Sequence, residues 1–122
     1  MGTLYLIAAF LALSVGIAHS VLGERYILIR LFRRDNLPKL FGGTEFTTRT
    51  LRFAWHLTTV AWWGAAAIFV CLAYEAATPG VVSAVLAATF LVTAAITLTF
   101  SRGKHLAWPV FAAIGLIAWY GA

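Results

Sequence analysis

Charged residues are scarce in this chain of 122 residues: Asp, Glu, Lys and Arg together make up 11% of it, against about a quarter in a typical soluble domain. The hydrophobic fraction is 62%, and the mean hydropathy is +0.91. A domain of this length buries too little surface to hide so many apolar side chains. The composition therefore excludes a soluble enzyme, a disordered chain and a coiled coil, and it indicates an integral membrane protein with a single domain, residues 1–122.

Cysteine is almost absent as well. Cys71 is the single cysteine, so the chain cannot hold an intramolecular disulfide and is not a disulfide scaffold. The HExxH and CxxC metal motifs, the Rossmann glycines and the nucleophile elbow are also missing from the sequence. The sequence therefore indicates no reaction class, and whether the protein is an enzyme stays open.

Long apolar runs are what the chain does contain. A membrane-spanning helix needs roughly 20 mostly apolar residues. Four segments meet this requirement: residues 3–22, 51–74, 80–100 and 105–121. The connections after the second and third segments are only a few residues long, so these neighbours must be antiparallel. We expect an all-α polytopic membrane protein, an up-and-down bundle of four transmembrane helices.

The basic side chains predict how this bundle is oriented, because all of them fall on one side of the predicted membrane. They are Arg25, Arg30, Arg33, Arg34, Lys39, Arg49, Arg52, Arg102 and Lys104. Positively charged residues in short loops stay in the cytoplasm. The basic segment 23–50 and the turn 101–104 are therefore expected inside, with both chain ends outside, and a bacterial inner membrane is the expected location.

The residues after the first predicted span alternate basic side chains with apolar and aromatic ones. That pattern is typical of a helix at the membrane interface, and it predicts a basic interfacial extension of the first helix. Four arginines are expected to meet anionic lipid headgroups: Arg25, Arg30, Arg33 and Arg34. Nucleic-acid binding is a poorer explanation, because these residues adjoin the membrane. Thr47 or Thr48 is expected to cap the second span.

Three histidines are predicted to lie at one depth, near the cytoplasmic ends of three different helices. His19 precedes the end of the first span by about one turn, His56 follows the start of the second by about one turn, and His105 opens the fourth. All three are expected within about 10 Å of depth, with Glu24 just beyond His19. Imidazole nitrogens beside a carboxylate are ligands for zinc, iron or copper, and two of the histidines could instead be axial ligands of haem b. The predicted metal site is therefore His19, His56, His105 and Glu24.

Two other interpretations of the histidines stay open: a proton relay, or amphipathic side chains that are hydrogen-bonded at helix ends. Gly16 and Gly23 flank His19 at spacings of three and four, which leaves that face bare for another helix. Trp55, near the end of the second span, is expected to anchor at the membrane interface. A stripe on the same span grows less polar with depth and resembles the lining of a vestibule: Arg52, His56, Thr59 and Trp63.

Hydroxyl side chains recur every four residues along the third span: Thr89, Thr93, Thr97 and Ser101. This spacing keeps them near one helix face. Together with Arg52 and Thr59, they are predicted to form a polar lining for ions, water or protons. In the alternative interpretation, each hydroxyl bonds the carbonyl four residues back or a neighbouring helix.

The size and the four-span layout are similar to those of the small multidrug resistance transporters. Those proteins resemble one another through a glutamate embedded in the middle of the first helix. Residues 6–15 of this chain contain no acidic residue, and Glu24 lies at or beyond the membrane edge. The resemblance therefore ends with the layout, and the chain is not assigned to that family.

Three functions are compatible with these observations. The first, which the histidines favour, is a bundle that binds a transition metal or haem near the cytoplasmic face. The second is a small proton-coupled transporter or channel that uses the same histidines. It would be a homo-oligomer, because four spans enclose little volume. The third is a structural subunit of a larger membrane complex.

Overall fold

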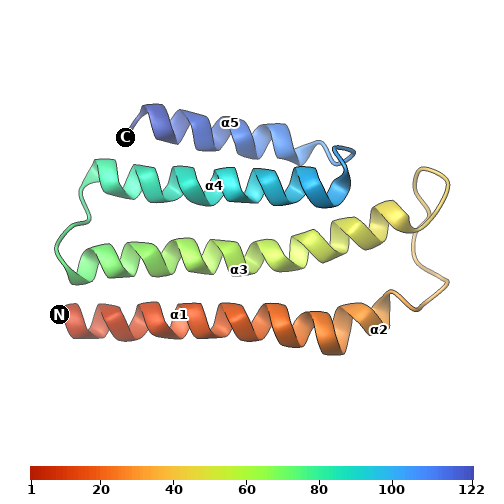
Figure 1. Cartoon of the computed structure of the whole chain (residues 1–122), viewed down its shortest axis with the longest axis horizontal. Helices are drawn as coiled ribbons and strands as arrows, with labels where there is room; N and C mark the ends of the chain where they lie inside the picture. Colours follow the sequence, from red (N-terminus) through yellow and green to blue (C-terminus); the bar gives the residue numbers. More distant parts are fainter.

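The computed structural model describes all residues, 1–122, and contains four helices and no strand (Figure 1). The first helix is continuous from Gly2 to Leu31 and consists of three parts: α1 (Gly2–Leu22), the π-helical segment η1 (Gly23–Leu28) and α2 (Ile29–Leu31). The other helices are α3 (Glu45–Ala73), α4 (Pro79–Ser101) and α5 (Ala107–Tyr120). The all-α prediction is confirmed.

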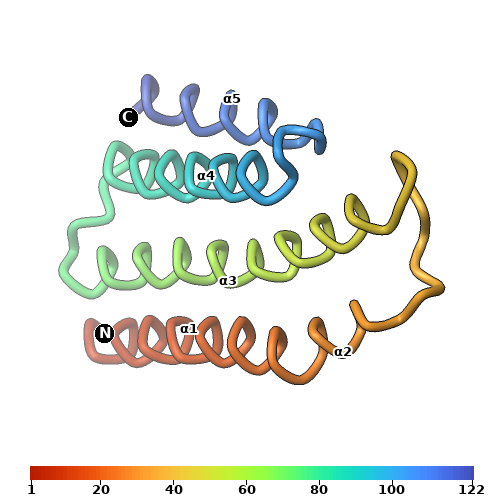
Figure 2. Tube along the Cα trace, turned by 45° about the vertical axis from the view of Figure 1, so that its right-hand side comes forward, coloured from red at the N-terminus to blue at the C-terminus, as the bar shows by residue number.

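The four helices lie side by side in chain order, each antiparallel to the next (Figures 1 and 2). α1 packs on α3, α3 on α4, and α4 on α5, while α1 makes no packing contact with α4 or α5. Only 13 of the 122 residues are buried, because the protein is a single layer of helices with both faces open. Large apolar side chains such as Phe10, Leu11 and Ile117 are exposed, as expected for surfaces that meet lipid.

Three helices are long and apolar enough to cross a membrane: Gly2–Leu31, Glu45–Ala73 and Pro79–Ser101. The fourth predicted span, 105–121, is the helix α5, which has 14 residues. At 1.5 Å per residue such a helix is about 21 Å long, shorter than the roughly 30 Å of a bilayer's hydrocarbon core. The protein is therefore compatible with membrane insertion through three of its helices.

The two ends of this layer differ in charge. Both chain termini lie at one end (Figure 1). The opposite end, called the basic end below, contains η1, α2, the loop 32–44, the first turns of α3 and the turn 102–106. Every Lys and Arg of the chain belongs to these segments.

The start of α3 differs from the prediction. The helix begins at Glu45 rather than near Leu51, and its N-cap residue Thr44 makes no side-chain cap hydrogen bond. The hydroxyl of Thr47 donates to the carbonyl oxygen of Pro38 at 2.8 Å. The prediction that Thr47 or Thr48 caps this helix is therefore wrong, because the amphipathic first turns extend it beyond the apolar stretch.

Candidate functional site

The first helix and α3 approach each other closely at two glycines, Gly16 in α1 and Gly23 at the start of η1. A Cβ at Gly16 would lie 2.6 Å from the indole Nε1 of Trp63, and a Cβ at Gly23 would overlap the indole of Trp55. The backbone at both glycines is helical, so any residue could adopt it. Glycine is required there because a Cβ would collide with a tryptophan ring. The bare face predicted around His19 is thus filled by two tryptophan rings from α3.

Side chains of α3 hydrogen-bond to the backbone of α1 along this contact. Trp55 Nε1 donates to the carbonyl oxygen of His19 at 2.9 Å, Thr59 Oγ1 to that of Gly16 at 3.1 Å, and Trp63 Nε1 to that of Leu13 at 3.3 Å. The donors recur every four residues on α3 and the acceptors every three on α1, as the antiparallel arrangement allows. This interhelical ladder fixes the register of the two helices. It also directs the indole N–H of Trp55 to α1 rather than to lipid headgroups.

His19 is part of the same contact. Its Nε2 lies 3.1 Å from the carbonyl oxygen of Trp55, and a carbonyl can only accept, so Nε2 carries the hydrogen. The imidazole is stacked on the Trp55 ring with centroids 4.5 Å apart and meets the edge of Trp62 at 5.1 Å. These contacts make His19 a packing and hydrogen-bonding residue of the helix pair.

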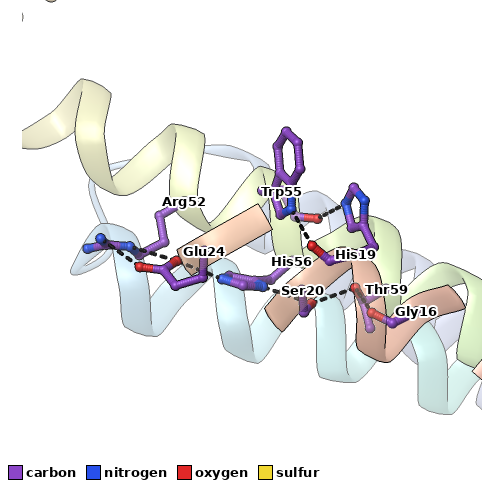
Figure 3. A network of polar contacts seen from close by, with 8 residues as sticks. All are labelled: Gly16, His19, Ser20, Glu24, Arg52, Trp55, His56 and Thr59. Atoms are coloured by element: carbon purple, nitrogen blue, oxygen red, sulfur yellow. Dashed lines mark hydrogen bonds and ion pairs between the residues drawn. The ribbon is translucent and has the colours of Figure 1, made fainter. Parts of the chain in front are cut away.

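A polar cluster lies on the basic-end side of this contact (Figure 3). It consists of Ser20, Glu24, Arg52, His56 and Thr59. The Glu24 carboxylate accepts from Arg52 through both oxygens, Nη2 to Oε1 at 2.9 Å and Nε to Oε2 at 3.2 Å. Oε2 also lies 3.2 Å from His56 Nε2. One carboxylate from the first helix thus contacts both an arginine and a histidine from α3.

His56 is bonded at its other ring nitrogen too. Nδ1 lies 2.9 Å from Ser20 Oγ, and Ser20 Oγ lies 2.6 Å from Thr59 Oγ1. The chain of contacts ends where Thr59 donates to the carbonyl oxygen of Gly16. A continuous hydrogen-bonded path therefore joins the Glu24 carboxylate to the backbone of α1.

Counting hydrogens along this path gives one arrangement that satisfies every contact. Thr59 gives its single hydroxyl hydrogen to Gly16, so Ser20 donates to Thr59, and His56 Nδ1 must then donate to Ser20. His56 Nε2 faces an ionised carboxylate that can only accept, so Nε2 donates as well. The arrangement as observed is satisfied by an imidazolium with hydrogens on both nitrogens.

The cluster is only partly buried. The side chains of Glu24, Arg52 and His56 are 31%, 33% and 25% exposed. These three side chains are therefore accessible to water at the basic end, while the hydroxyl side of the path stays inside the helix contact. Thr59, by comparison, is buried.

The π-helical segment η1 begins at Gly23, immediately before Glu24. Its wider turn carries i to i+5 hydrogen bonds, and such segments are common at functional sites. The backbone N–H of Ile29 bonds the carbonyl oxygen of Glu24 in this way. The segment therefore determines how the carboxylate is placed relative to His19 and Ser20, one turn earlier.

The three histidines do not form one group. His105 packs against Phe46 and Phe53, with ring centroids 5.9 and 5.2 Å away, and its Nδ1 accepts the backbone N–H of Ala107 at 3.3 Å. His56 alone contacts Glu24. No group of three or more His, Cys, Asp or Glu side chains is arranged to hold a metal ion.

The hydroxyl row of α4 is separate from the polar cluster. Thr89 and Thr97 donate to the carbonyl oxygens of Val85 and Thr93, four residues back, each at 2.8 Å. Thr93, Thr97 and Ser101 are buried. For Thr89 and Thr97, these are the contacts expected if the hydroxyls bond the carbonyl four residues back rather than line a polar pathway.

Two members of the site were not identified from the sequence. Ser20 links His56 to Thr59, and Trp55 exchanges hydrogen bonds with His19 in both directions. The signal for Trp55 was its spacing of four from Thr59 and of eight from Trp63, which places it on the same helix face.

Comparison of the chain with protein-family models, with curated proteins and with solved structures gives no match.

Proposed function

We propose that the chain is a small proton-coupled membrane transporter whose proton-binding site is the polar cluster. The observation that carries the proposal is His56, which is hydrogen-bonded at both ring nitrogens between the Glu24 carboxylate and the Ser20 hydroxyl. Histidine is the side chain whose charge changes most readily near neutral pH. Ionisable groups inside membrane helices are costly and commonly mark proton relays.

Loss of one proton rearranges the hydrogen bonds of the cluster. If Nδ1 of His56 loses its hydrogen, Ser20 must donate to it and Thr59 must donate to Ser20. The carbonyl oxygen of Gly16 then loses its side-chain donor from α3, which weakens the contact between α1 and α3. Deprotonation is thus linked to separation of the two helices, the kind of step that a proton-coupled cycle requires.

The proposed membrane placement has four spans with both chain ends outside. It is supported by the confinement of every basic side chain to one end of the layer and by the positive-inside rule. The short helix α5 would cross a locally thinned bilayer. α2 and the following loop would lie on anionic headgroups, which Arg25, Arg30, Arg33 and Arg34 would meet in a bacterial inner membrane.

A homo-oligomer is part of the proposal. A row of helices in which α1 does not touch α4 or α5 encloses no pathway of its own. A transport pathway would therefore form between protomers, with the partly exposed Arg52 on one side. Thr59 and most of the hydroxyl row 89–101 are buried within the protomer, so they would line this pathway only once the helices separate. A structural subunit of a larger complex would also leave both faces open, but it does not account for a charged cluster inside a helix contact.

The metal or haem hypothesis stays a prediction with less support. Its four proposed ligands are distributed over separate contacts, and only His56 and Glu24 touch. His19 Nε2 carries a hydrogen that is donated to a carbonyl, so that nitrogen has no lone pair for zinc, iron, copper or haem iron. Elemental analysis and an absorption spectrum of the purified protein test it directly.

The experiment is a pH jump on proteoliposomes adsorbed to a solid-supported membrane, which records charge movement without knowledge of the substrate. The wild-type protein should give a transient current, and Glu24→Gln and His56→Gln should reduce it at least tenfold. His105→Gln is the matched control and should leave the current unchanged. Equal currents in wild type and His56→Gln would rule out the polar cluster as the proton site.

A further inference from the structure

A second site lies at the basic end, away from the polar cluster. A cavity of about 170 Å³ opens between the loop 40–43, the first turns of α3 and the turn that follows α4. One water occupies roughly 30 Å³ in the liquid, so the cavity has room for a tetrahedral anion. Its polar lining comes from two helices and the turn: Glu45, Arg49, Ser101, Arg102 and Lys104.

The charge around the cavity is positive. Three cations, Arg49, Arg102 and Lys104, face one anion, Glu45, which leaves a net charge of +2. Glu45 Oε1 is 2.9 Å from Arg49 Nη2 and 3.5 Å from Arg102 Nη1, whereas Lys104 has no ion pair. The hydrogen bond from Arg49, with the nearby charges, lowers the pKa of the Glu45 carboxyl, which precedes the apolar stretch of α3. The one acid thus pairs with both arginines through a single carboxylate oxygen, Oε1.

Several hydrogen-bond donors around the same cavity have no acceptor within the protein. Arg49 has five N–H hydrogens, of which Nε and Nη2 use one each on Glu45 and Nη1 uses one on the carbonyl oxygen of Phe100. Ser101 is 2% exposed, and its Oγ has no hydrogen-bond partner within the protein. A buried hydroxyl without a partner is costly and calls for an explanation.

We propose that this cavity binds a phosphomonoester or inorganic phosphate, with Arg102, Lys104 and the Ser101 hydroxyl as its principal donors. A dianionic phosphate matches the net charge of +2, and its oxygens can accept from several converging donors at once. A carboxylate has one charge and two oxygens and would leave some of these hydrogen-bond donors without an acceptor. A metal ion would be repelled by the three cationic side chains. The proposal is independent of the proton site.

Two sources supply this chemistry, free phosphate and a lipid whose headgroup is a phosphomonoester. The experiment is isothermal titration of the full chain in neutral detergent with three probes: inorganic phosphate, dioctanoyl phosphatidic acid and dioctanoyl phosphatidylglycerol. One-to-one binding of either of the first two, at least tenfold tighter than the phosphodiester phosphatidylglycerol, is expected. Binding of phosphatidic acid alone identifies a lipid ligand, and binding of inorganic phosphate alone identifies a soluble one.

Variants separate a built site from general attraction to a basic surface. Arg102→Gln and Lys104→Gln should each weaken binding about tenfold, because each removes a charge-assisted hydrogen bond. Lys39→Gln removes the same charge from an exposed lysine that neither lines the cavity nor belongs to the arginines expected to meet lipid headgroups, and it should change the affinity less than twofold. Ser101→Ala should weaken binding severalfold without altering the net charge. An absence of one-to-one binding, or an equal loss in Lys39→Gln and Lys104→Gln, would overturn the proposal.

Discussion

Replacing Gly23 by alanine should push the Trp55 indole away from α1 and break the hydrogen bond of the interhelical ladder that Trp55 donates to His19. The added Cβ would overlap the rigid indole ring rather than the end of a flexible side chain. The ring can move only by giving up its 2.9 Å hydrogen bond to the carbonyl oxygen of His19 and its stacking on the His19 imidazole. One methyl group thus tests the close approach, the ladder and the aromatic contact together.

The expected cost follows from these three losses. An interhelical hydrogen bond in a membrane protein contributes about 0.6 kcal/mol on average and about 1.7 at most. An aromatic pair contributes about 0.5–1.5 kcal/mol, and overpacking costs about 1–3 kcal/mol. Alanine regains about 1 kcal/mol in helix propensity. The free energy of unfolding of Gly23→Ala should therefore fall by about 2–3 kcal/mol.

Equilibrium unfolding of the detergent-solubilised protein by SDS, followed by far-ultraviolet circular dichroism, measures this change. Gly80→Ala is the control, because its Cβ would meet its nearest atom only at 3.6 Å, an ordinary contact. It should change the stability by less than about 1 kcal/mol. In a Trp55→Ala background the cost of Gly23→Ala should vanish. A Gly23→Ala protein as stable as Gly80→Ala, or a cost that persists without Trp55, would refute the reasoning.

Two further predictions use matched pairs. Thr59→Val should lower the free energy of unfolding by about 1 kcal/mol, because the Thr59 hydroxyl donates to the Gly16 carbonyl of the other helix. Thr97→Val should change it by less than about 0.5 kcal/mol, because the Thr97 hydroxyl bonds a carbonyl of its own helix. Equal effects of the two substitutions in SDS unfolding would contradict the interhelical ladder. The lowered pKa of Glu45 means that its stabilising contribution is complete above the ordinary value of 4.5 and is lost as the pH falls through the lower folded-state value. In thermal unfolding measured across acidic pH, Glu45→Gln should reduce the loss of stability as the pH falls, while Glu75→Gln at the other end of the molecule should not. An unchanged pH dependence in Glu45→Gln would argue against the ion pairs.

Much of the architecture could be predicted from the sequence because membrane helices are specified by local composition. Apolar runs and short polar turns define all four helices to within a few residues at most ends. The start of α3 was missed because its first turns are amphipathic and extend beyond the apolar stretch. The π-helical segment at Gly23 was missed because no composition rule distinguishes it from an α-helical continuation.

The candidate site was only partly predictable for a geometric reason. The segments 18–24 and 51–57 combine costly polar residues with small ones, and the structure brings them into contact. Depth along each helix follows from counting residues, but rotation about its axis does not, and one residue corresponds to 100°. His19 and His56 therefore share the α1–α3 contact without facing a common point. His105 lies in the turn before α5 and packs against Phe46 and Phe53 of α3, so equal depth does not bring it to the α1–α3 contact.

Thr59 connects the structural and the chemical halves of the α1–α3 contact. Its hydroxyl is the middle rung of the ladder and also the last member of the path that begins at Glu24. Because it has a single hydrogen, it can satisfy the Gly16 carbonyl or the Ser20 oxygen but not both. In the proposed cycle, protonated His56 would leave that hydrogen on the backbone of α1, and neutral His56 would draw it away through Ser20. The flanking tryptophan donors cannot reverse in this way, since an indole N–H only donates. The proposal therefore gives the contact two fixed hydrogen bonds around one that depends on the proton, which would confine the effect of protonation to the segment between Gly16 and Glu24.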